Sequence, residues 1–121
     1  MSKKRDPGRL LPLTSGMFQV LIALADGEKH GYAIIKEVAR RTDGTVTLSA
    51  GTLYTIVRRF VNEGVIAETD ERPDPALDDE RRRYYRLTEF GRDVAKAEAA
   101  RMETALGMAR AKALIPRTRL T

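Results

Sequence analysis

Hydrophobic residues recur at helical spacing between Ser49 and Gly64. The apolar positions fall at i, i+3, i+4, i+7 and i+8 of one helical face, namely Leu53, Ile56, Val57, Phe60 and Val61. Small, hydroxylated and polar residues fall on the opposite face, namely Gly51, Thr55, Arg58 and Asn62. This pattern predicts a helix that buries one side in a core and presents the other to a polar, anionic partner.

Two more helices are predicted before this one. The first follows Thr14 or Ser15 and ends at Asp26 and Gly27, and its apolar residues are too numerous for an exposed helix. The second begins near His30 and runs to about Thr42. Its predicted inward positions are Tyr32, Ile35, Val38 and Ala39, and its outward ones are Lys36, Glu37, Arg40 and Arg41. Three such helices form a helix-turn-helix unit.

Two short strands follow the third helix. Residues 65–69 and 83–87 are rich in apolar and aromatic residues, and the 13 residues between them (70–82) are polar and contain two prolines. That connection is too long for a tight hairpin turn. The predicted fold class is therefore mainly α with a small β-hairpin, a winged helix-turn-helix followed by a long C-terminal helix.

The C-terminal helix is predicted from Glu89 to about Leu114, with Thr88 as its cap and Pro116 beyond its end. At about 39 Å it is longer than a domain of this size can cover. Its apolar strip predicts pairing with a second copy of the chain through Phe90, Val94, Met102, Ala105, Leu106 and Ala109. A helix packed wholly on its own domain is the alternative.

These elements predict four regions. Residues 1–12 form a flexible basic arm, which either lies along phosphates or is a solvated tail. Residues 13–88 form the winged-helix DNA-binding domain, 89–114 the dimerisation helix, and 115–121 a tail.

Charge is distributed unevenly along the 121 residues. Residues 70–80 contain six acids and one base, a net charge of −5 within a chain of net charge +5, so the other residues carry +10. The basic surface is therefore stronger than the total suggests, and it favours an anionic partner such as double-stranded DNA.

Composition also excludes several classes of function. The chain has no cysteine and one histidine, His30, which is predicted to be a turn or cap residue rather than a ligand or pH sensor. No metal-ligand spacing, nucleophile grouping or phosphate-binding glycine loop appears, which predicts a protein that is not an enzyme and needs no metal or cofactor. Without a signal sequence or membrane span, a cytoplasmic location is expected.

The exposed face of the third helix supplies the candidate DNA contacts. Arg58 is placed to reach phosphate or a guanine edge, and the first turns hold hydroxyls and free amides suited to phosphate. The candidates on this helix are Ser49, Gly51, Thr52, Tyr54, Thr55, Arg58 and Arg59. Tyr54 could instead pack in the core, and Arg59 could simply be solvated.

Arginines near the wing are further candidates. Arg82 and Arg83 could enter a minor groove or bind phosphate. The alternative is that Arg81 and Arg82 only offset the charges of the nearby acids.

The strings GTLYTIVRRF, EGVI and RRRYYRLTEFGR, with HGYAIIKEV upstream, resemble the PadR-like winged-helix transcriptional regulators, short subgroup. The resemblance covers roughly residues 13–92. It implies a homodimeric repressor whose C-terminal helix dimerises and whose third helix enters the major groove. Pairing of two long C-terminal helices in turn predicts an inverted-repeat operator. The resemblance leaves open a small-molecule effector, and the absence of tryptophan means that the family's tryptophan-based drug binding does not transfer. A winged-helix protein-interaction module without specific DNA binding is the alternative function.

Overall fold

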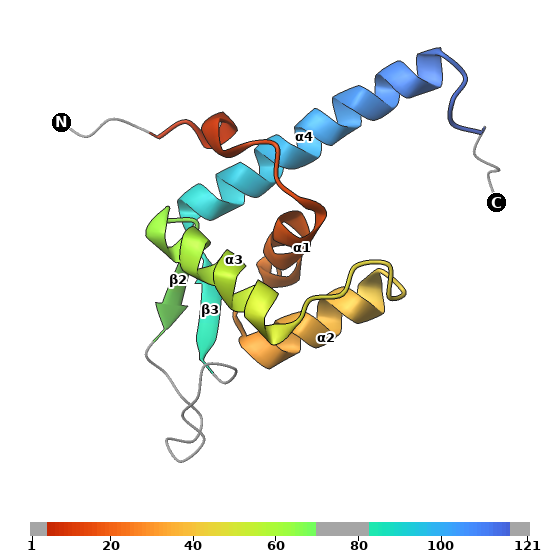
Figure 1. Ribbon diagram of the computed structural model, residues 1–121. Coiled ribbons are helices and arrows are strands. Elements are labelled where there is room, and N and C mark those ends of the chain that lie inside the picture. Colours follow the sequence, from red (N-terminus) through yellow and green to blue (C-terminus); the bar gives the residue numbers. More distant parts are fainter. Residues whose placement is uncertain (1–4, 70–82, 117–121) are drawn as a thin grey trace.

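The computed structural model describes residues 5–69 and 83–116. Along the chain lie η1 (Pro7–Leu10), α1 (Ser15–Leu24), β1 (Lys29–His30), α2 (Gly31–Arg41), α3 (Ala50–Asn62), β2 (Ile66–Thr69), β3 (Tyr84–Leu87) and α4 (Glu89–Ala111) (Figure 1). This is the predicted winged helix with a long C-terminal helix.

Each of the four α-helices begins at a residue whose side chain accepts a hydrogen bond from a backbone N–H of the first turn. These caps are Thr14, His30, Ser49 and Thr88. The sequence predicted Ser49 and Thr88, indicated His30 as a turn or cap residue, and left the first cap between Thr14 and Ser15. Capping depends on local chemistry, which is why these positions could be predicted from the sequence.

The sheet has three antiparallel strands in the order β1-β3-β2. Ile66 pairs with Leu87 in the predicted hairpin, and His30 of β1 pairs with Tyr84 on the other edge of β3. The sequence missed β1 because its two residues carry no alternating pattern, and only pairing with β3 makes them a strand. The acidic segment 70–82 lies outside the described residues.

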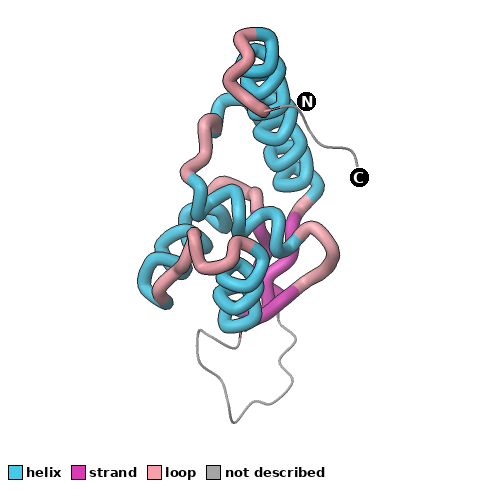
Figure 2. Tube along the Cα trace, turned by 90° about the vertical axis from the view of Figure 1, so that its right-hand side faces the viewer, coloured by secondary structure: helices cyan, strands magenta, loops and turns pink. Residues whose placement is uncertain are grey.

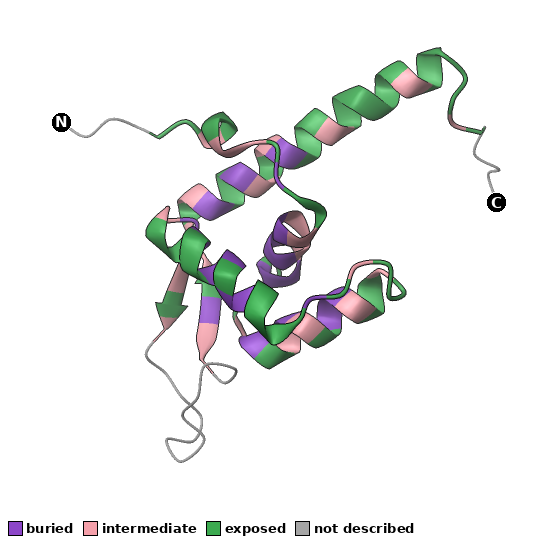
Figure 3. Ribbon diagram, viewed as in Figure 1, coloured by how far each residue is buried: buried purple, intermediate pink, exposed green. Residues whose placement is uncertain are grey.

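The core is built around α1 and the inner face of α3 (Figure 3). Val20, Leu21, Leu53 and Phe60 are fully buried, as their spacing predicted. Val61 is 37% exposed, so the buried stripe of α3 is narrower than expected.

The predicted inner face of α2 was partly wrong. Tyr32 is 45% exposed, whereas Glu37 is buried. Glu37 tolerates burial because Arg41 Nε donates a hydrogen bond to it at 2.6 Å and Lys29 Nζ lies 3.6 Å away. The burial of Glu37 could not be predicted from the spacing of apolar residues, because it depends on the two cations that pair with its carboxylate.

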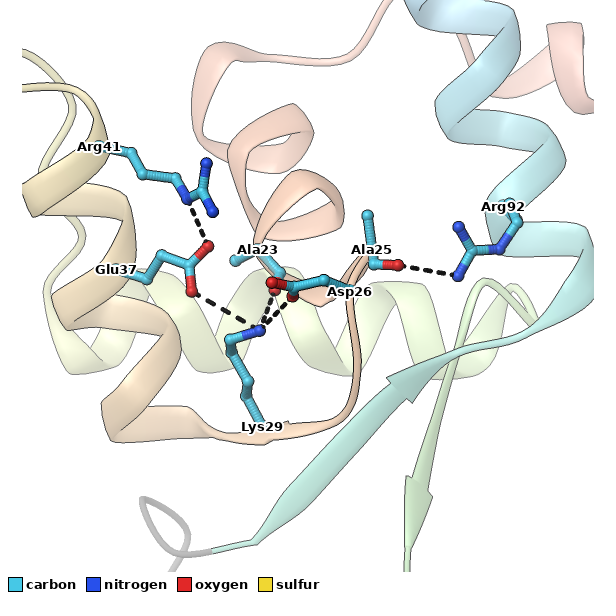
Figure 4. A network of polar contacts seen from close by, with 7 residues as sticks. All are labelled: Ala23, Ala25, Asp26, Lys29, Glu37, Arg41 and Arg92. Carbon is cyan, nitrogen blue, oxygen red and sulfur yellow. Dashed lines mark hydrogen bonds and ion pairs between the residues drawn. The ribbon is translucent and has the colours of Figure 1, made fainter.

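The same Lys29 joins a network around the turn after α1 (Figure 4). Its Nζ donates to the carbonyl oxygen of Ala23 at 2.7 Å and to Asp26 at 2.5 Å, and this contact lowers the pKa of Asp26. Arg92 of α4 donates to the carbonyl oxygen of Ala25 at 3.1 Å. These contacts hold α2 and α4 against the end of α1.

Part of the predicted basic arm packs on the domain. Among its described residues, η1 is capped by Asp6 and lies along α4. Leu10 and Leu11 pack against the core. Prolines and glycine excluded an α-helix here but not a short 3-10 turn.

α4 has two different halves (Figures 1 to 3). Its inner half is part of the core, since Val94 and Glu98 are fully buried and Phe90 packs partly against the core. Val94 therefore faces its own domain and was wrongly assigned to a dimer interface, and Phe90 is largely engaged within its own chain as well. The outer half projects away from the domain.

The end of α4 comes three residues earlier than expected. Ala113 adopts a positive φ of 60°, and Leu114 N–H bonds back to the carbonyl oxygen of Ala109 at 2.9 Å. None of the helices within the described residues is long and apolar enough to cross a membrane.

Candidate nucleic-acid interface

One side of α3 faces solvent from its first residue to its last. The exposed residues include six predicted DNA contacts, namely Ser49, Gly51, Thr52, Thr55, Arg58 and Arg59. The helix presents this polar side while its apolar side is buried, so the geometry agrees with the amphipathic pattern.

The first turn of α3 has an ordered set of hydroxyl groups. Ser49 Oγ accepts a hydrogen bond from the N–H of Thr52 at 3.1 Å and donates to Thr52 Oγ1 at 3.0 Å. Thr55 donates to the carbonyl oxygen of Gly51 at 3.0 Å. Of the hydroxyl groups of Ser49, Thr52 and Thr55, that of Thr52 is the one whose proton has no acceptor among the described residues, so it can donate to an outside acceptor such as a phosphate oxygen.

The two arginines of α3 differ in what they contact. Arg59 Nε lies 3.4 Å from Glu63 Oε2, an exposed i, i+4 pair. Arg58 makes no hydrogen bond or ion pair with any other described residue. It borders a shallow hollow of about 150 Å³ between α3 and the sheet. Arg58 can therefore bind an external anion without first breaking an internal contact.

Tyr54 was wrongly assigned to the interface. Its side chain is buried at 8% exposure, and a Cβ atom at Gly31 would lie 2.6 Å from its hydroxyl oxygen. Tyr54 thus packs between α2 and α3, which requires glycine at position 31. The alternative weighed from the sequence, that this residue packs, is the one observed.

The wing arginines give a mixed result. Arg83 lies beside the same hollow, and its Nη1 donates to Glu68 Oε2 at 3.0 Å. Arg82 lies outside the described residues. Arg83 remains close to α3, although an anion would have to compete with Glu68 for it.

A cluster at the start of α2 was not predicted. Lys36 Nζ lies 4.8 Å from the centroid of the exposed Tyr32 ring, which stacks on His30 at 6.5 Å. His30 also meets the edge of Tyr84 at 5.5 Å, and its Nδ1 caps α2, as expected. The i, i+4 spacing of Tyr32 and Lys36 was the signal available in the sequence.

α2 begins at the same end of the molecule as α3 and β3 (Figure 1), and His30 pairs with Tyr84 of β3 there. The cluster places an exposed aromatic ring and a cation next to the candidate interface. Among the described residues, no group of histidine, aspartate or glutamate side chains is arranged to hold a metal ion.

The outer half of α4 exposes an apolar strip at the opposite end of the molecule. Met102 and Ala109 are half-buried, while Ala105 and Leu106 are exposed, Leu106 at 47%. These four residues share one face and continue the line of the buried inner half. They are the members of the predicted dimerisation set that remain accessible to a partner.

Known proteins resemble this chain in sequence and in fold. Residues 20–97 match the model of the transcriptional regulator PadR-like family. A Lysinibacillus sphaericus protein named Uncharacterized protein X is 27% identical over 73 residues, 60% of this chain and 64% of that relative, so the match spans less than two thirds of the relative.

Solved structures show the same fold. A transcriptional regulator from Clostridium thermocellum has a TM-score of 0.66 and 26% identity, over 78% of this chain and 88% of its own. A PadR family regulator from Eggerthella lenta has a TM-score of 0.60 and 27% identity, over 81% and 82% of the two chains. Bacillus subtilis PadR, solved in complex with operator DNA, shares the fold at 17% identity and a TM-score of 0.58, over 91% of this chain and 52% of its own.

Proposed function

The chain belongs to the PadR-like family of transcriptional regulators, and from this membership we propose that it is a homodimeric repressor that binds an inverted-repeat operator. The family makes it a DNA-binding transcription regulator rather than an enzyme. Repression, the dimer and the operator symmetry are the further steps of the proposal.

The exposed polar face of α3 is the observation that carries the proposal. Arg58 is exposed and uncommitted to any described residue, and Thr52 keeps a hydroxyl proton for an outside acceptor. In a helix-turn-helix, the exposed face of the recognition helix reads base edges in the major groove. Arg58 is proposed to reach phosphate or a guanine edge, with Ser49, Gly51, Thr52 and Thr55 near phosphate.

Other residues have supporting roles in the proposal. Arg59 and Arg83 are secondary contacts, because both are already paired with acids of their own chain. Arg82 is retained from its sequence position alone. A small-molecule effector that relieves repression is compatible with the fold, and no residue is assigned to it.

The outer half of α4 supports the dimer. Its apolar strip, half-buried at Met102 and exposed at Leu106, would leave water by pairing with the same strip of a second copy. Two α3 helices held at a fixed separation could read half-sites about 34 to 36 Å apart, one turn of B-DNA.

Selection of bound duplexes from a random-sequence pool by the purified protein tests this function. The enriched sequence should be an inverted repeat, and Arg58→Ala should weaken binding to it by about 5- to 160-fold for each half-site, the range expected when a base or phosphate interaction of about 1–3 kcal/mol is removed. Circular dichroism should show that the variant remains folded, because Arg58 lies outside the core.

Lys96→Ala is the matched control, since it removes one positive charge from an exposed site on α4, remote from α3. It should bind like the wild type apart from a small effect of net charge. Equal loss in both variants would mean that only total charge matters. No enrichment, with capture of a protein partner instead, would favour the interaction-module alternative.

A further inference from the structure

The first described residues cross from α3 to α4. The Arg5 guanidinium donates a hydrogen bond to the carbonyl oxygen of Glu63, at the end of α3, and lies 5.1 Å from the centroid of the Phe90 ring in α4. Gly64, with φ of 77°, allows this approach, since a Cβ atom there would lie 2.8 Å from Arg5 Nη1. One side chain therefore joins the end of the recognition helix to the start of α4.

A second anchor lies at the other end of the same segment. Glu98 of α4 is fully buried, and its Oε2 accepts a hydrogen bond from the backbone N–H of Leu13 at 2.8 Å. Arg101 Nε donates to Glu98 Oε1 at 2.5 Å. Because a buried carboxylate is costly without donors, these bonds hold Leu13 firmly against the middle of α4.

We propose that residues 5–13 act as a strap that sets the direction in which α4 leaves the winged-helix domain, with Glu98 and Arg5 as positioning residues. Between the two anchors, η1 lies along the inner half of α4, which also contacts α1 (Figures 1 and 2). Among the described residues, the outer half has no comparable support from its own domain, so the inner half determines its direction. This inference rests on the proposed dimeric DNA binding.

The direction of α4 matters because a small tilt of its inner half moves its outer end by several ångströms. The helix extends about 20 Å beyond Glu98, so a tilt of roughly 10° moves its end by about 3.5 Å. That displacement is close to the 3.4 Å rise of one base pair. A loosened strap would let the two α3 helices vary in separation, which lowers affinity at the best half-site spacing and makes neighbouring spacings more acceptable.

The test uses the full chain and the duplex selected from the random-sequence pool. That duplex is remade with its half-sites one or two base pairs closer together or farther apart. Glu98→Ala and Arg5→Gln each remove one anchor, and Glu98→Gln keeps an acceptor for Leu13. Glu103→Gln is the control, an exposed glutamate of the same helix that makes no hydrogen bond or ion pair with another described residue.

Glu98→Ala and Arg5→Gln should lose on the order of 10-fold in affinity at the preferred spacing, part of the avidity that a fixed geometry gives to two linked sites. The loss should shrink at neighbouring spacings. Affinity for a duplex with a single half-site, and the dimer dissociation constant, should stay within about twofold of wild type. The affinity of Glu98→Gln at the preferred spacing should lie between those of wild type and Glu98→Ala, and that of Glu103→Gln should match wild type.

A purely structural role would give a different result. Affinity would then fall equally at every spacing, in step with the unfolded fraction measured by circular dichroism, and the strap would be refuted. A spacing profile unchanged in the folded Arg5→Gln variant would refute it as well, even if Glu98→Ala does not fold. A wild-type protein that is monomeric or selects no inverted repeat would instead remove the proposed function, before any variant is compared.

Discussion

At the scale of single residues, two positions hold the first turn of α4 on the turn that follows α3. Thr88 Oγ1 donates to the carbonyl oxygens of Gly64 and Val65 at 2.6 and 3.0 Å, and accepts from the N–H of Gly91 at 2.9 Å. Gly91 faces the backbone of Val65 so closely that a Cβ atom there would lie 2.0 Å from its carbonyl oxygen. The start of α4 is thus packed directly on the turn after α3.

Gly91→Ala should therefore destabilise the protein by about 3 kcal/mol, because a backbone atom cannot move aside as a side chain can. Gly107→Ala is the matched control in the same helix, where a Cβ atom meets nothing within 4 Å. It should stabilise the protein by up to about 1 kcal/mol through helix propensity. Chemical denaturation at one protein concentration measures both, and equal effects would contradict the close contact.

The buried carboxylate of Glu98 should make the stability of the folded protein depend on pH. The hydrogen bond from Arg101 is the largest influence on its pKa, and with the Leu13 N–H it outweighs burial, so the pKa lies below its ordinary value of 4.5. A lowered pKa in the folded state stabilises the protein above the unfolded value, and this contribution is lost as pH falls through the folded value. Wild type should therefore exceed Glu98→Gln in stability most clearly above about pH 5.

That difference should shrink steadily as the pH is lowered below 4.5. Urea denaturation at a series of pH values measures it. Glu103→Gln should differ from wild type by less than about 0.5 kcal/mol throughout, as expected of a surface substitution. A wild-type advantage that grows on acidification would show that the folded pKa is raised instead.

At the scale of elements, helix periodicity predicted the helices and their buried faces, but it could not predict contacts between residues far apart in the sequence. The caps and the buried face of α3 were predicted because propensity and amphipathicity act within a few residues. The burial of Glu37, the strand at Lys29 and the strap residue Arg5 depend on partners far along the chain. The exposure of Arg58 followed from spacing alone, whereas the burial of Tyr54 required knowledge of Gly31.

The outer half of α4 carries the prediction for assembly. Leu106→Glu should raise the dimer dissociation constant by at least about 100-fold. Burial of each leucine side chain in the interface contributes roughly 2 kcal/mol, whereas burial of a glutamate charge in its place is unfavourable. Met108→Glu is the control, because Met108 lies about 200° around the helix from Leu106 and is 65% exposed. Sedimentation velocity over a concentration series measures both.

The two variants separate the faces of α4. A dimer broken by Met108→Glu and retained by Leu106→Glu would place the interface on the other side of the helix. A wild-type protein that remains monomeric at high concentration would show that the strip has another partner. In both variants the winged-helix domain should stay folded, because neither Leu106 nor Met108 belongs to the core.

At the scale of the whole molecule, the exposed apolar strip and the candidate DNA-binding surface lie at different ends. The exposed apolar strip lies at the outer end of α4, while the polar face of α3 and the Tyr32–Lys36 cluster lie at the opposite end (Figure 1). A dimer formed through α4 would therefore leave both α3 faces accessible. With net charge +5 on each chain, a dimer would carry +10 to the DNA.

Binding of the dimer to the selected duplex should therefore depend steeply on salt. A protein that neutralises about 6 to 10 phosphates releases the counterions bound there, and its affinity falls by roughly 10³ to 10⁵ between 50 and 200 mM salt. Fluorescence anisotropy over that range gives the slope, and Arg58→Ala should lower it by about 1 for each phosphate that is no longer neutralised, so by about 2 in the dimer. If Arg58 touches a base edge only, affinity should fall with little change in slope, because no counterion is released there. A slope near zero in the wild type would mean that phosphate contacts do not drive binding, and the exposed face of α3 would then need another partner.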